Sequence, residues 1–544
     1  MKLNWLFAIK YTLAILLAWF LSSYFGFDKP YWSMMTVAII GYPDPSLSLA
    51  KMAARLSGSV IGVIAVTLIA NISINDHWIF TALIIIWLSI CLFMTLISRY
   101  MMPYLFSLSG YTSAIIAFGT SVFPLPMTIF NLSQERLMEV MIGIVVYTFI
   151  TYLLPNQSNI PQTKLIDKKI QTEKKQLLSN LFKQRNDKIH TSLKNVLESS
   201  ISYDETSQYE SHFLSFKTAK HKAKQLPMLI VFSIMGMVDK HFLKYTSYKQ
   251  FLGFKKQDND LSDSSFYYFF DWKDAFLNTL RLVISLVISV LFWLNTGWEY
   301  GYILPVLVSI SFTFGVTIPN ANKLAFIILV VAILVIIISY ILKFYFLIQA
   351  SSYFQAVMIM APIFLILGVL KSVGKLAFLL SHVVCISMIF LINFTNPMDF
   401  DFSYFANTSI ALIFSIIIVI LMLYIIPLSS AQQIESRKMN FMLQKISSMT
   451  SKDLNSDKLK NTILLNISAI SNPKHINKLY VLLSLISLYQ LAKSHDAKNK
   501  IFHLIHSVSI GKDKSSILFS INLEDKSNDD ISLKYSHKIL NFLL

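Results

Sequence analysis

The sequence is poor in charge and in cysteine. Only 14% of its 544 residues are charged and 55% are hydrophobic, which is far from the composition of a soluble globular protein. Its two cysteines, Cys91 and Cys385, both fall inside apolar runs and have no neighbouring metal ligands. They indicate neither a redox compartment nor a metal site, and we expect both to be buried thiols.

The sequence also lacks the signatures of nucleotide hydrolysis and of catalysis. The phosphate-binding loop G-x-x-x-x-G-K-[ST] does not occur, and the stretch IGKDKSS near the end lacks its first glycine. No nucleophile–base pair, metal-ligand cluster or cofactor loop stands out. We therefore expect a protein that is not an enzyme and that uses no metal and no cofactor.

Long apolar runs are what the sequence has in abundance. A straight helix needs about 20 apolar residues to cross a bilayer. Runs of this length occur at Leu6–Phe25, Ile79–Ile97, Phe276–Leu294, Leu324–Phe346 and Ile410–Ile426. They predict an all-α, polytopic membrane protein. The first run has no small-x-small cleavage site, so we interpret it as an uncleaved first helix.

Hydropathy divides the chain into two apolar halves, 1–155 and 271–428, each followed by a polar part, 156–270 and 429–544. Each apolar half can be cut into six segments. The segments of the first half lie at about 5–25, 31–50, 53–71, 78–98, 102–123 and 134–154. Those of the second half lie at about 275–294, 300–318, 323–346, 352–370, 374–394 and 403–427.

This order predicts an internal duplication. Since six crossings return the chain to the side on which it started, the halves would be two parallel six-helix repeats, related by an axis along the membrane normal. Both polar parts carry apolar residues at three- and four-residue steps, which predicts a helical domain after each half.

The net charge of +17 gathers in the polar parts and in one set of loops. Lys and Arg mark the cytoplasmic side of a membrane protein. We therefore expect a bacterial inner (plasma) membrane protein with both termini and both polar domains in the cytoplasm. The distribution favours contact with a lipid bilayer and not with nucleic acid.

The stretch PYWSMMTVAIIGYPDPSLSLAK begins like a membrane span and then breaks. About ten residues follow Trp32, roughly half a span, before glycine and Pro43 interrupt the run and Lys51 closes it. The second half shows a similar pattern, with Trp298 at the start, Pro305 in the middle and Lys323 at the end.

Such a break has a specific physical cost. Proline removes a backbone donor and disturbs the preceding turn, and unpaired backbone groups facing lipid cost several kcal/mol each. Interrupted segments in corresponding places therefore indicate the substrate site of a transporter. The alternative in the first half is that Gly41–Pro45 is only the loop between two helices.

The same residues carry a resemblance to a known family. The run DKPYWSMMTVAIIGYPDPSLSLAKMAARLSGSVIG resembles the signature of the fusaric acid resistance and aromatic acid exporter family. Its matching positions are Pro30, Tyr31, Trp32, Thr36, Val37, Ile39, Pro43, Lys51, Arg55, Gly58 and Gly62. The stretches Glu135–Pro155 and LRLVISLVISVLFWLNTGWEYG are also similar. The resemblance implies export of aromatic carboxylates or other small organic anions, together with a periplasmic membrane-fusion adaptor.

An anion exporter needs cations near its inner mouth and an apolar or aromatic surface. Lys51 and Arg55 are four residues apart, on one face of a helix, and so are candidates to bind a carboxylate. Arg281 is a third candidate, and Trp32 and Trp298 are candidates to stack on an aromatic solute. The alternative is that these cations and tryptophans only anchor the helices at the membrane interface.

Proton coupling needs a titratable group within the membrane. Glu139, three residues after Arg136, is the best acidic candidate, and His382 is the other. The alternatives are a local ion pair and a histidine buried in the core. Gly58 and Gly62 predict close helix packing first and an oligomer contact second.

These observations predict a secondary-active, proton-coupled efflux transporter for small aromatic or amphipathic acids, which we expect to form a homo-oligomer. One alternative is a passive organic-anion channel, which would use the same cations. Another is a membrane scaffold without transport activity.

Overall fold

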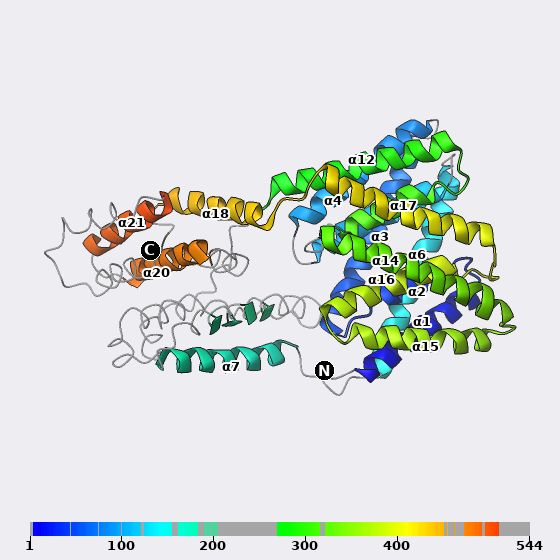
Figure 1. The fold of residues 1–544 in the computed structure, drawn as a ribbon, viewed down its shortest axis with the longest axis horizontal. Coiled ribbons are helices and arrows are strands. Elements are labelled where there is room, and N and C mark those ends of the chain that lie inside the picture. The colour runs from blue at the N-terminus through cyan, green and yellow to red at the C-terminus, as the bar shows by residue number, and fades with distance from the viewer. Residues whose placement is uncertain are drawn as a thin grey trace. The chain divides into compact units, whose positions relative to one another are not determined.

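The computed structural model describes residues 4–43, 45–73, 76–98, 101–120, 125–154, 162–182, 269–315, 321–450, 473–491 and 495–510, with isolated residues between 191 and 203 and at 454 and 463. The chain forms two compact units, one from residues 1–159 and 272–428 and one from residues 160–271 and 429–544. All regular structure in the described ranges is helical (Figure 1).

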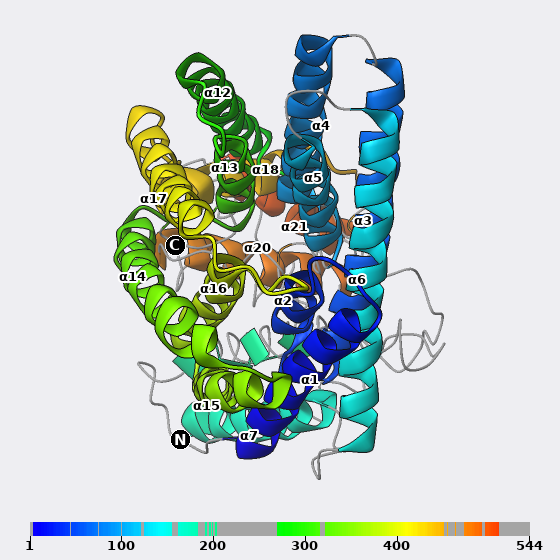
Figure 2. The same ribbon diagram turned by 90° about the vertical axis from the view of Figure 1, so that its right-hand side faces the viewer.

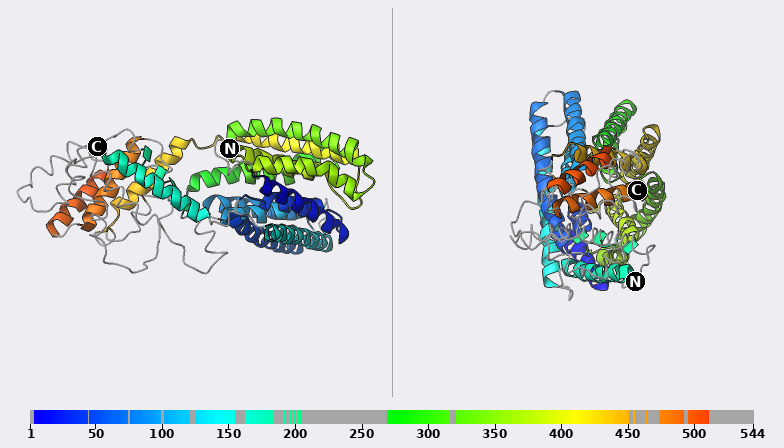
Figure 3. Two further views of the ribbon diagram at one scale, coloured as in Figure 1. Left: turned by 90° about the horizontal axis from the view of Figure 1, so that it is seen from below. Right: turned by 90° about the vertical axis from the view of Figure 1, so that its left-hand side faces the viewer.

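The first unit holds two successive groups of helices. The first group consists of α1 (Trp5–Tyr24), α2 (Tyr31–Ile40), α3 (Pro45–Ile72), α4 (His77–Ile97), α5 (Met102–Gly119) and α6 (Pro126–Leu153). The second consists of α12 (Trp272–Thr296), α13 (Ile303–Gly315), α14 (Ala321–Ile341), α15 (Tyr353–Lys371), α16 (Lys375–Ile392) and α17 (Phe402–Ile425). A π turn, Leu342–Phe346, and a 3-10 turn, Leu347–Gln349, extend α14. The helices run roughly alongside one another (Figure 3).

Eight of the helices in the described ranges are long and apolar enough to cross a membrane. Their outward faces are rich in apolar side chains. On α14, for example, Ile333, Leu334, Ile337 and Ile338 are exposed. Since no water would contact such faces inside a bilayer, this pattern suits lipid-facing helices. The prediction of an all-helical, polytopic membrane protein is confirmed.

The predicted segments agree approximately with the helices, except at the break and at the start of α6. The second segment ends at Ile40 instead of residue 50, because Gly41 is extended and Pro43 follows it. The next helix starts at Pro45, earlier than predicted, because proline fits the first turn of a helix, where no backbone donor is needed. The segment predicted at 134–154 also begins earlier, at Pro126.

The two groups of helices contact each other through several pairs of helices. Helix α2 packs on α16 and α5 packs on α13, while α1 packs on α15 and α4 on α12 (Figure 2). Within the groups, α3 contacts α5 and α6, and α14 contacts α16 and α17. All ten residues of α2 are buried, so this short helix lies in the core of the unit.

The second unit combines residues from both polar parts of the chain. It contains α7 (Gln162–Phe182), α18 (Ala431–Ser447), α20 (Pro473–Leu491) and α21 (His495–Ile510). Helix α20 is buried from Leu479 to Leu488 and packs on α21. Arg437 in α18 binds Asp271 through two nitrogens, at 2.6 and 3.0 Å.

Close packing of α3 on α5 depends on Gly58 and Gly62. A Cβ atom at Gly58 would lie 2.7 Å from the Leu105 carbonyl oxygen, and one at Gly62 would lie 2.7 Å from that of Ser109. Backbone atoms cannot move aside as a flexible side chain can. The two glycines thus allow the helices to approach backbone to backbone.

We expect Gly62→Ala to destabilise the protein by about 1–3 kcal/mol, the usual cost of overpacking. The melting temperature of the detergent-purified protein measures this. Gly119→Ala is the control, because its nearest neighbour, Leu132, would lie at an ordinary 3.8 Å. Equal melting temperatures for the two variants would contradict the packing role of Gly62.

Candidate functional site

The interruption between α2 and α3 is held together by side chains from several helices. The amide of Tyr42 donates to the Ser48 Oγ (3.2 Å), and the Tyr42 carbonyl accepts from the Tyr147 hydroxyl (3.3 Å). The carbonyl of Ala38, in the last turn of α2, accepts from Lys371 Nζ at 2.6 Å. Backbone groups that a continuous helix would have paired are thus paired by α3, α6 and α15.

Lys51, near the start of α3, lies between two aromatic rings. Its Nζ donates to the Tyr42 hydroxyl at 2.5 Å and stands 4.2 Å from the centre of that ring and 4.9 Å from that of Tyr104. Ring faces attract a cation, especially away from water. Among the ion pairs of the described residues, none involves Lys51.

Arg55, one turn later, is 3% exposed and contacts hydroxyl groups. Its Nε donates to Thr36 Oγ1 at 3.2 Å, and one terminal nitrogen donates to the hydroxyls of Tyr104 and Tyr111, both at 3.3 Å. Thr36 belongs to α2 and the tyrosines to α5. The guanidinium is therefore held in place from two sides by neutral groups.

Arg136 in α6 is also buried, and it contacts Trp32. Its guanidinium carbon lies 3.2 Å from the centre of the Trp32 ring. Its Nε and one terminal nitrogen are buried without a hydrogen-bond partner. Buried polar groups normally have partners, so these two donors need an explanation.

Glu139 follows Arg136 by one turn of α6 and is 2% exposed. The two side chains form no close ion pair among those of the described residues, although the Glu139 carboxylate is near enough to interact electrostatically with the Arg136 guanidinium. The Arg136 donors therefore remain available to another group.

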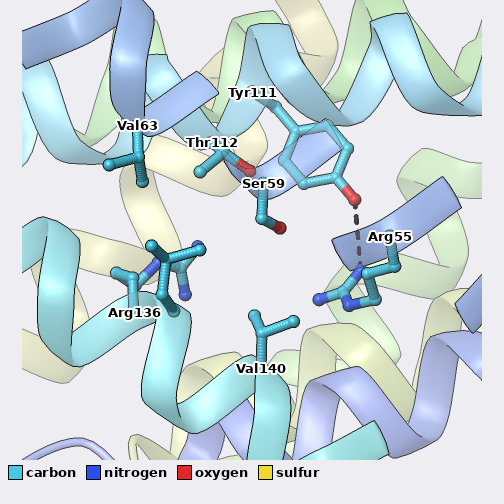
Figure 4. A pocket seen from close by; sticks show the side chains of 8 residues that line it. Arg55, Ser59, Val63, Tyr111, Thr112, Arg136 and Val140 are labelled. Carbon is cyan, nitrogen blue, oxygen red and sulfur yellow. Dashed lines mark hydrogen bonds between the residues drawn. The ribbon is translucent and has the colours of Figure 1, made fainter. Parts of the chain in front are cut away.

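A small cavity of about 10 Å³, room for about one water molecule, lies between α3, α5 and α6. It is lined by Arg55, Ser59 and Val63 from α3, Tyr111 and Thr112 from α5, and Arg136, Leu137 and Val140 from α6. Arg55 and Arg136 lie on opposite sides of it, with the Ser59 hydroxyl between them (Figure 4). Two guanidinium groups and a few hydroxyls are donors that favour an anion, and Val63, Leu137 and Val140 supply apolar contacts beside them.

His382, on α16, lies near the interruption and outside this pocket. Its ring stacks on Phe378, with ring centres 5.7 Å apart, and Phe378 in turn lies 4.7 Å from the Tyr42 ring. The His382 Nδ1 is buried without a partner.

The second half does not repeat the predicted break at Pro305. This proline is the third residue of α13, in its first turn, where it leaves the helix intact. The prediction that it interrupts a span is wrong, because the helix begins at Ile303 and not at residue 300. Pro362, in contrast, lies inside α15.

The other candidates from the second half have structural partners. Trp298 donates from Nε1 to the Asn407 side chain at 2.6 Å. Arg281 donates to the carbonyls of Ile426 and Pro427, both at 2.7 Å, and to Asn278, so it caps the end of α17. Lys323 is in α14, and its side chain lies outside the described part of the chain. None of these lines the pocket.

Lys371 is a residue near the interruption that no sequence pattern indicated as part of the site. Its partners lie more than 300 positions away in the chain, so no local pattern indicates them. In the described ranges, no group of three or more His, Cys, Asp or Glu side chains is placed to hold a metal ion.

Comparison with known proteins extends the resemblance seen in the sequence. The chain is 31% identical over 156 residues to the "Uncharacterized transporter YdhK" of Escherichia coli (strain K12), covering 29% of this chain and 23% of YdhK. It is 30% identical over 161 residues to the "p-hydroxybenzoic acid efflux pump subunit AaeB" of Edwardsiella ictaluri (strain 93-146), covering 28% of this chain and 24% of that subunit.

These alignments span about a quarter of the length of the curated relatives. No solved structure matches the chain. The sequence profile described as "Fusaric acid resistance protein family" matches residues 4–209 and 249–464, which is most of the chain and includes both groups of helices in the first unit. The protein therefore belongs to the fusaric acid resistance protein family.

Proposed function

We propose that this protein is an efflux transporter of the bacterial inner membrane that exports small organic anions, with aromatic carboxylic acids as the first class to test. The observation that carries the proposal is the pocket between Arg55 and Arg136. Both side chains are buried and both line the same space, and neither forms a close ion pair with a carboxylate of the described residues.

The physical basis is the cost of a buried charge. An uncompensated cation in a membrane protein is expensive, and such residues usually mark an ion or substrate pathway. Thr36 and the two tyrosines around Arg55 hold its guanidinium but supply no negative charge. A carboxylate in the pocket would supply the charge and would fill the open donors of Arg136.

The contacts between helices support the predicted duplication. If α1–α6 correspond in order to α12–α17, then each contact between the groups has a counterpart. The contact of α1 with α15 corresponds to that of α12 with α4, and the contact of α2 with α16 corresponds to that of α13 with α5. The described glycines with positive φ, Gly26 and Gly297, each follow the first helix of a group.

We interpret the first unit as two parallel six-helix repeats, and we place both termini and both polar parts in the cytoplasm on the basis of loop charge. Glu139 is the proposed proton acceptor, with His382 as the second candidate. The periplasmic adaptor and the homo-oligomer also stay predictions. The relative named as an efflux pump subunit favours export over uptake.

We expect the double variant Lys51→Ala/Arg55→Ala to reduce efflux of labelled p-hydroxybenzoate at least about ten- to hundred-fold, because loss of the charge-assisted contact from Arg55 alone costs roughly 1.5–3 kcal/mol. Efflux from loaded cells measures this, with membrane insertion checked by blotting. The control is Lys273→Ala, since Lys273 is an exposed cation in the first turn of α12. Unchanged efflux in the double variant would contradict the site.

We expect Glu139→Gln to abolish concentration of substrate against a gradient while downhill movement persists, because glutamine cannot release a proton. Proteoliposomes with an imposed pH gradient measure both. Glu135→Gln, one turn earlier on α6 and partly exposed, is the control. If transport by the wild-type protein is unchanged when the proton gradient is collapsed, the result would instead favour the passive anion channel. No transport of any organic acid would favour the scaffold.

A further inference from the structure

Lys371 joins the second group of helices to the broken end of α2. It is the last residue of α15, and its side chain is 2% exposed. Its Nζ donates to the Ala38 carbonyl at 2.6 Å and to the Gly41 carbonyl at 3.3 Å. One side chain therefore contacts both the last turn of α2 and the extended residue that ends it.

The surroundings of Lys371 do not suit a membrane anchor. A lysine that only fixes topology extends its ammonium to water at the interface. The ammonium of Lys371 instead lies 4.4 Å from the centre of the Tyr11 ring and 5.4 Å from that of Phe378. No ion pair of the described residues includes it.

The carbonyl end of α2 supplies the complementary charge. The free carbonyls at the C-terminal end of a helix carry a partial negative charge, which a cation stabilises. Because α2 is short and fully buried, water does not reach these carbonyls from its sides. The contact therefore fixes the position of α2 relative to α15.

Helix α2 also forms the support of the arginine pocket. Thr36 accepts from Arg55 Nε at 3.2 Å, and the Trp32 ring lies under the Arg136 guanidinium. A shift of α2 would therefore displace the partners of both arginines together.

We propose that Lys371 is a positioning residue for the anion site. It fixes the position of α2, and two residues of α2 orient the arginines. Thr36 orients Arg55, and Trp32 orients Arg136. The inference rests on the proposed transport function, and it adds that the second group of helices controls a pocket formed within the first. Movement of one group of helices relative to the other would shift α2 and so change the affinity of the pocket for an anion. An anion that binds one arrangement of the groups more tightly than the other would in turn favour that arrangement.

The first test is transport by the full-length protein in proteoliposomes, with p-hydroxybenzoate as the probe. We expect Lys371→Met to raise the half-saturation constant at least ten-fold and to change the maximal rate less than two-fold. Lys371→Arg, which keeps the charge and the donors, should restore the wild-type constant. The matched control is Lys343→Met, since Lys343 is a buried lysine of the same group of helices, 1% exposed, whose ammonium lies near the Phe344 ring and not against α2.

The second test needs no substrate. The guanidinium of Arg136 lies against Trp32, so the emission of Trp32 reports the position of α2. Its contribution is obtained by subtracting the spectrum of the matching Trp32→Phe protein. We expect this difference spectrum to change in Lys371→Met and to be retained in Lys371→Arg and Lys343→Met. If Lys371→Met does not insert, Lys371→Gln replaces it in both tests.

A wild-type half-saturation constant and an unchanged Trp32 spectrum in Lys371→Met would overturn the inference. The inference would also be overturned if Lys371→Met and Lys371→Arg raised the half-saturation constant equally and lowered the melting temperature equally. That result would indicate that Lys371 has a packing role alone. If the wild-type protein transports no organic acid but the Trp32 spectrum still responds to Lys371→Met, the transport proposal fails and the positioning role stands.

Discussion

Backbone hydrogen bonding at the end of α2 is the constraint on which the first unit depends. Inside a bilayer, a helix that stops leaves carbonyls that only the protein can pair. The carbonyls of Ala38 and Gly41 accept from Lys371 of α15, and the carbonyl of Tyr42 accepts from Tyr147 of α6 and Ser48 of α3. The break therefore brings distant parts of the chain to one point and makes α2 the centre of the unit.

The buried cations differ in what surrounds them, and this difference separates structural from functional roles. Arg281 donates to two carbonyls and an asparagine, and so completes the end of α17. Arg136 has a ring on one face and open donors on its edge. A guanidinium whose three nitrogens all have protein partners offers less to a ligand than one whose nitrogens lack partners beside a cavity, because the second can bind a carboxylate without losing a protein contact.

Comparison of the two prolines explains why part of the site was predictable. The glycine and proline after Trp32 lie in the connection between α2 and α3, which is the alternative that the sequence offered, because neither residue favours continuation of a helix there. Pro305 likewise predicted an interrupted helix, but it lies in the first turn of α13 and does not interrupt it. Its effect depends on where α13 begins, a boundary that a uniformly apolar run does not reveal. The four-residue spacing of Lys51 and Arg55 correctly placed both on one helix. It did not predict that aromatic rings surround Lys51 or that hydroxyl groups surround Arg55.

By itself the sequence determined that this is a helical membrane protein, where most of its helices run, and to which family it belongs. These properties follow from local composition and from a contiguous motif. Only the tertiary structure decided that Arg136 shares a pocket with Arg55, that Arg281 is a helix cap, and that Lys371 reaches α2. Each of these depends on the distance between side chains on separate helices, and helix packing sets that distance in ways that spacing along the chain does not encode.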